Sequence, residues 1–225
     1  MSTPSVPRRS FLGRFFVGSI AALSASPVLA AACAPGASTA PASTNELDTW
    51  LATMHGPEKV FYDATMAAGA MDGILFARNF LKFSQEKLGT KDSEMSVIVS
   101  FRHFATPYGY NDAMWKKYPQ FGAMLKVDDP KTKKPAVRNV PLTDEMEGFP
   151  GTSLPALAAH GVKFSVCGAA TAFLAGVVAG KTGDAKAVEA DLSANLIPGA
   201  ILAPAGVVAV QRAQKAGFAY TYTGG

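Results

Sequence analysis

The amino-acid sequence predicts a single α/β domain, a three-layer sandwich around a five-stranded, mainly parallel sheet. Three observations support this prediction. Five short apolar segments with strand character alternate with helical patterns, residues 93–103 are almost continuously apolar, and 48% of the 225 residues are hydrophobic. Strands that alternate with helices are typical of a parallel sheet, a continuously apolar strand is buried on both faces, and this apolar content is enough for one core.

The first strand, helix and strand are predicted between residues 58 and 103. Residues 58–65 have the apolar alternation of a short strand. In the helix that follows, four apolar residues recur at spacings of four, three and four and share one face: Ala70, Ile74, Ala77 and Leu81. This helix should end near Gly89, and residues 93–103 then form the second strand.

A long irregular segment interrupts the pattern after a predicted helix at 111–118. Residues 119–151 contain five prolines and show no sustained periodicity, which is unusual for a connection inside a compact domain. We therefore interpret 119–151 as an insertion, either a partly ordered lid over a site or an excursion on the surface. The charges at 128–134 are typical of a solvated turn rather than a binding patch.

The rest of the chain continues the alternation of strands and helices. A helix at 152–161 should begin with Thr152 or Ser153 as its N-cap and end at Gly161. The remaining elements follow in this order: a strand that ends at Cys167, a small-residue helix from about 169, a helix at 184–194, a strand at 200–204, a helix at 206–216 and a strand at 218–222. The helices supply the crossovers that parallel strands require.

Residues 1–32 have the features of an export signal, and the folded domain is expected at 46–225. Arg8-Arg9-Ser10-Phe11-Leu12 resembles the twin-arginine translocation motif, and the apolar run after it is too short and too interrupted to span a membrane stably. An ordinary secretory signal is the alternative. Either signal predicts a periplasmic or exported protein.

Residues 33–45 are uncharged and rich in Ala, Pro, Ser and Thr, which predicts a flexible tether. Cys33, the first residue of this segment, could be the lipidated cysteine of a lipoprotein. However, Leu29 lies one residue too early for a lipoprotein signal, and cleavage after Ala32 fits about as well. Attachment to a membrane is therefore expected only if Cys33 is lipidated.

The positive charge of the chain belongs largely to the signal. Without Arg8, Arg9 and Arg14, 18 of the 21 basic residues remain against 17 acidic ones, which leaves a net charge of +1. The rest of the sequence contains no basic stripe and no interleaving of basic with aromatic residues. Nucleic acid is therefore not expected as a partner.

Cys167 stands between a predicted strand and a predicted helix. In "HGVKFSVCGAATAF", residues 160–173, Val162, Phe164 and Val166 form one face of the strand, and small residues follow the cysteine. A cysteine at this position lies near unpaired backbone N–H groups and the positive end of a helix dipole, which favours the reactive thiolate. Gly168 would allow a ligand to approach closely. The alternative is an inert cysteine that only fills space in the core.

Arg102 and His103 end the second predicted strand, so they belong to the same sheet edge as Cys167. His103 could accept a proton, hold a thiolate by charge or share a metal, and Arg102 could bind an anionic group. Because side chains alternate along a strand, only one of the two is expected to meet Cys167. A structural hydrogen bond is the alternative role for His103. His160 is expected to cap a helix, and His55 is a weaker candidate.

Several common functional motifs are absent from the sequence. It contains no His-Glu-x-x-His, no Cys-x-x-Cys and no nucleophile elbow. "AGKTGD" has the end of a phosphate loop but lacks the earlier glycine and the preceding strand. One cysteine with one histidine is also too few ligands for a closed zinc site.

The segments "HGVKFSVCGAATAF" and "LIPGAILAPAGVVAVQRAQKAGFAYTY" resemble the DsrE-like family of small α/β proteins. The resemblance covers about 153–223, extends more loosely to 58–103, and has no counterpart for the insertion. It implies a flavodoxin-like fold, assembly into trimers or hexamers, and a cysteine that carries a persulfide in the sulfur-relay members; Cys167 matches that cysteine. The chain departs from the family in its export signal and in Leu174-Ala175-Gly176, where relatives often have an arginine-glycine pair.

Three functions fit these observations. The first is an exported DsrE-like protein that performs sulfur-carrier or thiol chemistry through Cys167, with a thiol or sulfur-transfer protein as partner. The second is a non-enzymatic protein that binds a small ligand, a metal or haem in the same sheet-edge pocket, using His103. The third is an oligomeric scaffold without chemistry.

Overall fold

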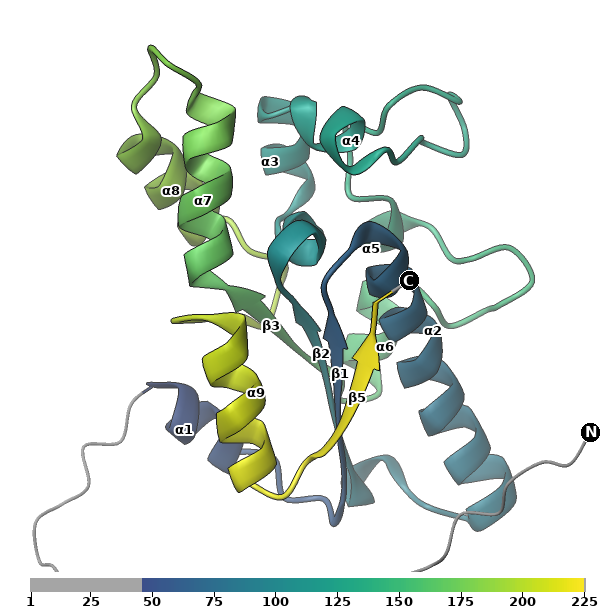
Figure 1. Ribbon diagram of the computed structural model, residues 1–225. Helices are drawn as coiled ribbons and strands as arrows, with labels where there is room; N and C mark the ends of the chain where they lie inside the picture. The colour runs from purple at the N-terminus through teal and green to yellow at the C-terminus, as the bar shows by residue number, and fades with distance from the viewer. Residues whose placement is uncertain (1–45, 225) are drawn as a thin grey trace, which may run out of the picture. The chain divides into compact units, whose positions relative to one another are not determined.

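The computed structural model describes residues 46–224 and confirms the three-layer α/β sandwich (Figure 1). The predicted signal at 1–32 and tether at 33–45 lie outside the described residues. The five strands are parallel and lie in the order β4-β3-β2-β1-β5. They are β1 (Glu58–Ala64), β2 (Met95–Phe101), β3 (Lys163–Cys167), β4 (Ala200–Ala203) and β5 (Ala219–Thr223). The sheet is wholly parallel, and every residue of β2 is buried, as its continuous apolar sequence predicts.

The predicted helices are present in the predicted order. They are α2 (Ala67–Phe83), α3 (Asp112–Lys117), α6 (Leu154–Ala159), α7 (Gly168–Ala179), α8 (Ala185–Ala194) and α9 (Gly206–Lys215). One turn of π-helix at Ser84–Leu88 prolongs α2 to Gly89, whose φ of 71° ends it. Ser153 is the N-cap of α6, because its side chain accepts a hydrogen bond from the Ala156 N–H. The short helix α1 (Glu46–Ala52) was not predicted.

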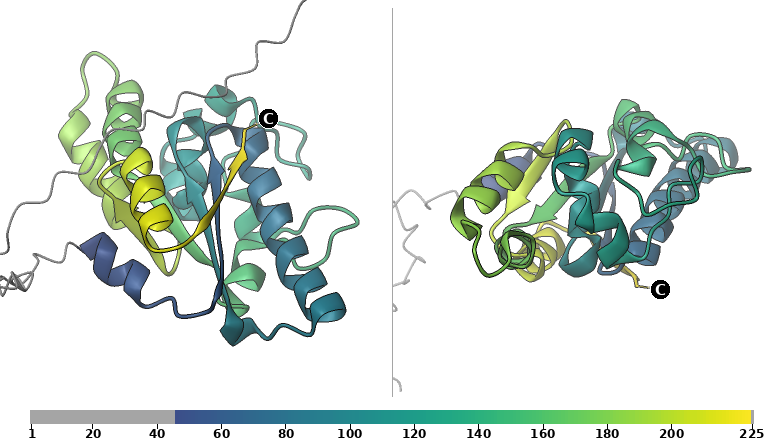
Figure 2. Two further views of the ribbon diagram at one scale, coloured as in Figure 1. Left: turned by 60° about the horizontal axis from the view of Figure 1, so that its bottom comes forward. Right: turned by 90° about the horizontal axis from the view of Figure 1, so that it is seen from above.

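Helices cover both faces of the sheet (Figure 2), and an apolar cluster lies on each face beneath them. On one face, Phe61 of β1 and Ile98 of β2 belong to a cluster with residues of α1 and α9. On the other face, Val97 and Val99 of β2 belong to a larger cluster with α2, α6 and Ala175 of α7. The four residues predicted to share one face of α2 are all buried in this larger cluster: Ala70, Ile74, Ala77 and Leu81.

This arrangement sends the helices that follow β3 and β4 to opposite faces. The chain builds β1, β2, β3 and β4 in one direction across the sheet, and then returns through α9 to place β5 beside β1. Helix α7 contributes to the cluster of α2, whereas α9 contributes to the opposite one. In an open parallel sheet, a crevice forms outside the carboxyl ends of two such neighbouring strands.

The insertion at 119–151 is an ordered part of the domain with two short helices, α4 (Gln120–Leu125) and α5 (Val140–Thr143). Its charged stretch forms a turn, as predicted, which is closed by a bridge between Asp128 and Pro135. Asn139 anchors the segment from inside, because its buried side-chain amide donates hydrogen bonds of 2.8 Å to the carbonyls of Tyr108 and Tyr110. No helix in residues 46–224 is long and apolar enough to cross a membrane.

Replacing Asn139 by Ala should lower the free energy of unfolding by about 2–4 kcal/mol, because it leaves two buried carbonyl groups without a donor. The measurement is urea denaturation followed by circular dichroism. Val137→Ala is the matched control, since Val137 is half-exposed in the same segment and should change stability by less than about 0.5 kcal/mol. Equal stabilities for the two variants would show that Asn139 does not anchor the insertion.

Candidate functional site

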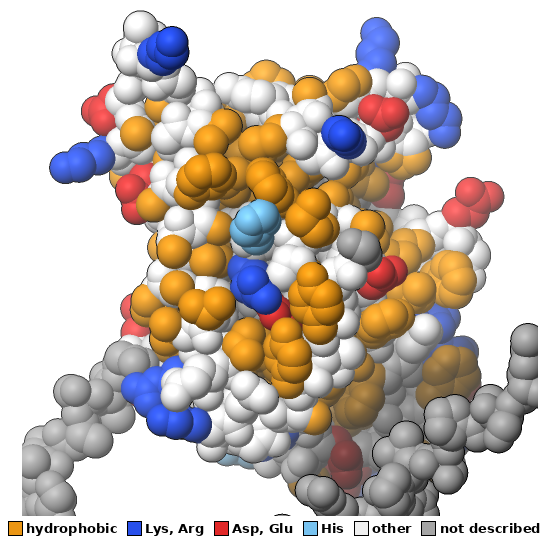
Figure 3. Space-filling model, in the orientation of Figure 1, with side chains coloured by type: hydrophobic (Ala, Val, Ile, Leu, Met, Phe, Trp, Pro, Cys, Tyr) orange, Lys and Arg blue, Asp and Glu red, His pale blue; other side chains and the backbone are white. Residues whose placement is uncertain are grey.

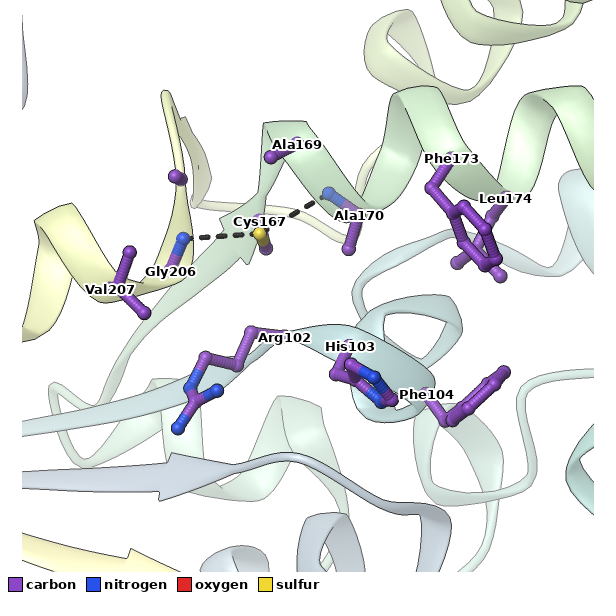
Figure 4. Close-up of a pocket in the computed structure, with 11 residues that line it drawn as sticks. Arg102, His103, Phe104, Cys167, Ala169, Ala170, Phe173, Leu174, Gly206 and Val207 are labelled. Carbon is purple, nitrogen blue, oxygen red and sulfur yellow. Dashed lines mark hydrogen bonds between the residues drawn. The ribbon is translucent and has the colours of Figure 1, made fainter.

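A cavity of about 370 Å³ opens at the carboxyl edge of the sheet, between the first turns of α7 and α9 (Figure 4). It lies at the crevice that the topology predicts. Its wall consists of Arg102, His103, Phe104, Cys167, Ala169, Ala170, Phe173, Leu174, Ala205, Gly206 and Val207. Hydrophobic side chains also gather across the middle of the molecular face shown in Figure 3.

Cys167 is the last residue of β3 and the N-cap of α7, so its predicted position between strand and helix is confirmed. Its sulfur accepts a hydrogen bond from the Ala170 N–H of α7 at 3.3 Å. It also accepts one from the Gly206 N–H, the first residue of α9, at 3.1 Å. The first contact was expected for a residue that precedes a helix, but the second depends on the tertiary fold. Two helix N-termini therefore direct backbone N–H groups at Sγ, where they can stabilise negative charge that develops on the sulfur.

Glycines allow these two helix starts to come close to the strand ends. A Cβ at Gly168 would lie 2.9 Å from the Ala203 carbonyl oxygen, and a Cβ at Gly206 would lie 2.6 Å from the Arg102 side chain. Gly168 was predicted to contact a ligand, but it is not part of the cavity wall. Its role is to pack α7 against the end of β4, which explains why a side chain is absent there.

Arg102 lies at the wall of the cavity and forms an ion pair with Asp63 of β1. Its Nε and Nη2 atoms donate to the two carboxylate oxygens of Asp63 at 2.7 and 2.8 Å. The hydroxyl of Tyr220 in β5 donates to the same carboxylate at 2.9 Å. Asp63 is fully buried, and its hydrogen bonds raise the pKa of Arg102. Sequence reasoning missed Asp63, although one acidic residue inside the apolar strand "VFYDA" was a usable signal.

His103 is exposed and lines the same cavity as Cys167 and Arg102. Only one of Arg102 and His103 was expected to meet Cys167, but both residues line the cavity, because β2 ends at Phe101 and strand alternation stops there. His103 has a φ of 54° and begins a 3₁₀-helix, η3 (His103–Gly109), which turns its side chain to the cavity. Its ring lies edge-on to Phe104, with 4.5 Å between centroids. Within residues 46–224, no hydrogen bond joins His103 to Cys167.

A buried chain of hydrogen bonds fixes the turn between β3 and α7. The Tyr110 hydroxyl donates to Thr171 Oγ1 at 2.9 Å, and Thr171 donates to the Cys167 carbonyl at 2.9 Å. Burial raises the pKa of Tyr110, so it remains a neutral donor. This chain holds the backbone of Cys167 still, while its sulfur faces the two helix starts.

The other sequence candidates lie away from the cavity. No residue of 119–151 contributes to its wall, so the insertion is not a lid over it. His160 is the C-cap of α6, as expected, and its ring pairs with Asp92 at 3.0 Å. His55 lines a separate depression beside α1 and α9. The described residues contain no group of three or more His, Cys, Asp or Glu side chains that could hold a metal.

Comparison with known proteins does not assign the site. No protein-family model, curated protein or solved structure matches the chain. The resemblance to the DsrE-like family therefore remains a prediction based on the motifs quoted above. The observed fold does not decide the matter, because a three-layer α/β sandwich supports many unrelated activities.

Replacing His103 by Asn should slow alkylation of Cys167 by iodoacetamide near pH 7 by about twofold to fivefold, because it removes the imidazole of the cavity wall, which can accept a proton during thiol chemistry. Asn keeps the fold intact, since it tolerates the positive φ of this position better than Ala. The measurement is the labelling rate on a Cys33→Ser background.

His160→Asn is the control for this test, because His160 lies outside the cavity. Equal labelling rates in the two variants would show that His103 does not affect the reactivity of Cys167. Labelling of Cys167 only after unfolding would show that the thiol is a packing residue.

Proposed function

We propose that this chain is an exported DsrE-like protein that uses Cys167 for sulfur-carrier or thiol chemistry. The observation that carries the proposal is the environment of Sγ, which accepts N–H groups from the starts of two helices at the wall of a cavity. A structural cysteine in a core needs neither the donors nor access to a cavity.

The donors to Sγ suit the chemistry of persulfides and mixed disulfides. In both reactions a thiolate attacks a sulfur atom, and the attack depends on the fraction of thiolate and on access to it. The N–H groups of Ala170 and Gly206 stabilise negative charge on the sulfur before the attack. His103 lies in the same wall and supplies an imidazole that can accept a proton during thiol chemistry.

Assembly into a trimer or hexamer belongs to the same proposal. The resemblance implies it, and α7 has the composition that suits it, since it is apolar on most sides. The side chains of Phe173 and Val177 on this helix are 62% and 51% exposed. A helix that buries only one side usually carries polar residues at such exposed positions, so this apolar surface suits a contact with another copy of the chain. A thiol or sulfur-transfer protein is the proposed partner in the reaction.

A second candidate function is non-enzymatic binding of a small ligand in the same cavity. The apolar wall favours it, because Phe104, Phe173, Leu174 and Val207 form a lining of the kind that small-molecule sites have. In this case Cys167 and His103 would contact the ligand without changing it. Haem or a metal fits this site less well than a compact organic ligand, because the cavity is small and the wall offers only Cys167 and His103 as ligand side chains.

Mass spectrometry of the purified protein should find Cys167 carrying extra sulfur that a reductant removes. The protein is purified in buffers that contain no reductant, and its mass is compared before and after treatment with dithiothreitol. A bound molecule or metal without modification of Cys167 would support the ligand-binding function instead. A Cys167→Ser variant is the control, since it should lose the reducible mass; an unmodified, unreactive Cys167 would contradict the proposal.

The double substitution Arg8→Lys with Arg9→Lys should leave the protein folded but in the cytoplasm, because the twin-arginine route reads the paired guanidinium groups. The measurement is cell fractionation followed by immunoblotting. Replacement of Lys82 and Lys87 by Arg is a control that conserves charge in the folded domain and should not change export. If the doubly substituted protein is still exported, the twin-arginine assignment is wrong.

A further inference from the structure

The cavity beside Cys167 has an almost entirely apolar wall. Of its lining residues, only Arg102, His103 and Cys167 have polar or ionisable side chains, and the others are Phe, Leu, Val, Ala and Gly. Its volume of about 370 Å³ is near the lower end of the range for small-molecule sites, roughly 300–1,000 Å³. A cavity of this size accepts a compact organic group beside the sulfur.

The charge of Arg102 is directed out of this cavity. Its guanidinium is bound by Asp63 through two hydrogen bonds and points away from Cys167 toward β1 (Figure 4). Its alkyl chain lies against the start of α9, since a Cβ on Gly206 would meet Cβ, Cγ and Cδ of Arg102. The side of Arg102 nearest α9 is therefore hydrocarbon, and its positive charge is already neutralised by a buried carboxylate.

We infer that the sulfur donor of Cys167 is a small persulfide whose organic group is apolar and uncharged. The inference rests on the proposed function and adds the class of substrate. An aromatic or branched alkyl group fits beside Phe104, Phe173 and Val207, where it replaces water at apolar surface. A carboxylate in the same place would lose hydration at apolar surface, and the guanidinium of Arg102 is not free to pair with it, because Asp63 already binds that group.

The transfer needs no oxidant and no cofactor. The Cys167 thiolate attacks the outer sulfur of the donor R–S–S–H, and a new bond forms between the two sulfur atoms. The S–S bond of the donor breaks, R–S⁻ leaves with the electron pair, and the proton stays on the transferred sulfur. The products are the Cys167 persulfide and the thiolate R–S⁻, which has the same charge as the starting thiolate.

Two matched donors test the inference on the full chain with Cys33→Ser. These are 2-phenylethyl persulfide and 2-carboxyethyl persulfide, which share a two-carbon stem and differ in a phenyl group or a carboxylate. The rate of gain of one sulfur atom on Cys167 is followed by mass spectrometry and divided by the rate of each donor with N-acetylcysteine. We expect the phenyl donor to be faster by about tenfold or more after this correction.

Phe173→Ser identifies the cavity as the source of this preference. Phe173 lines the cavity and is exposed, so the change should lower the advantage of the phenyl donor by about threefold to tenfold without unfolding the protein. Val177→Ser is the matched control, one turn later on α7, similarly exposed and outside the wall. It should keep the full preference, even if both changes alter assembly through α7.

The possible outcomes distinguish failure of this inference from failure of the proposed sulfur-carrier function. Equal corrected rates, or a faster carboxylate donor, would overturn the inference while Cys167 remains a sulfur carrier. Equal effects of Phe173→Ser and Val177→Ser would also overturn it, because the cavity would not be the source of selectivity. Transfer from neither donor, together with an unreactive Cys167, would overturn the proposed function itself.

Discussion

The reversal of the chain after β4 is the constraint on which the site depends. Because β5 returns to the far side of β1, the chain must leave β4 toward the face opposite to the one it chose after β3. Helices α7 and α9 therefore start side by side and then separate. Cys167 ends β3 at this point, so its sulfur receives one N–H group from each helix.

The ion pair of Asp63 with Arg102 ties β1, β2 and β5 together below the cavity, since Tyr220 binds the same carboxylate. A buried carboxylate loses much hydration, and it is tolerated here because three hydrogen bonds replace the lost water. The pair also has a consequence for recognition. By engaging the guanidinium, Asp63 removes a free positive charge from the cavity wall and leaves a surface better suited to apolar groups.

The sequence predicts the strands and α2 well, because burial imposes periodicities that are local in the chain. Ala70 to Leu81 share a face for this reason, and Cys167 ends its strand where the small residues begin. The contact of Gly206 with the sulfur could not be predicted in this way, since it joins residues 39 positions apart. The orientation of His103 was missed because the strand was predicted to continue to residue 103, whereas β2 ends at Phe101. The alternation of side chains along a strand therefore does not apply to His103. The sequence could not predict where the insertion packs. A buried, anchoring asparagine such as Asn139 looks the same in the sequence as an asparagine in an exposed loop.

The two glycines that begin α7 and α9 reduce the local stability of these helices but make the geometry of the site possible. Glycine loses more backbone conformational freedom on folding than any other residue, so fixing one at the start of a helix has an entropic cost. At Gly168 and Gly206 the missing Cβ is what allows the close approach, because a methyl group would meet the end of β4 or the stem of Arg102. Separation of either helix from the sheet would lengthen its N–H contact to Sγ. The same small residues that weaken α7 and α9 locally therefore hold the sulfur between two donors, and the packing of the sheet compensates for them.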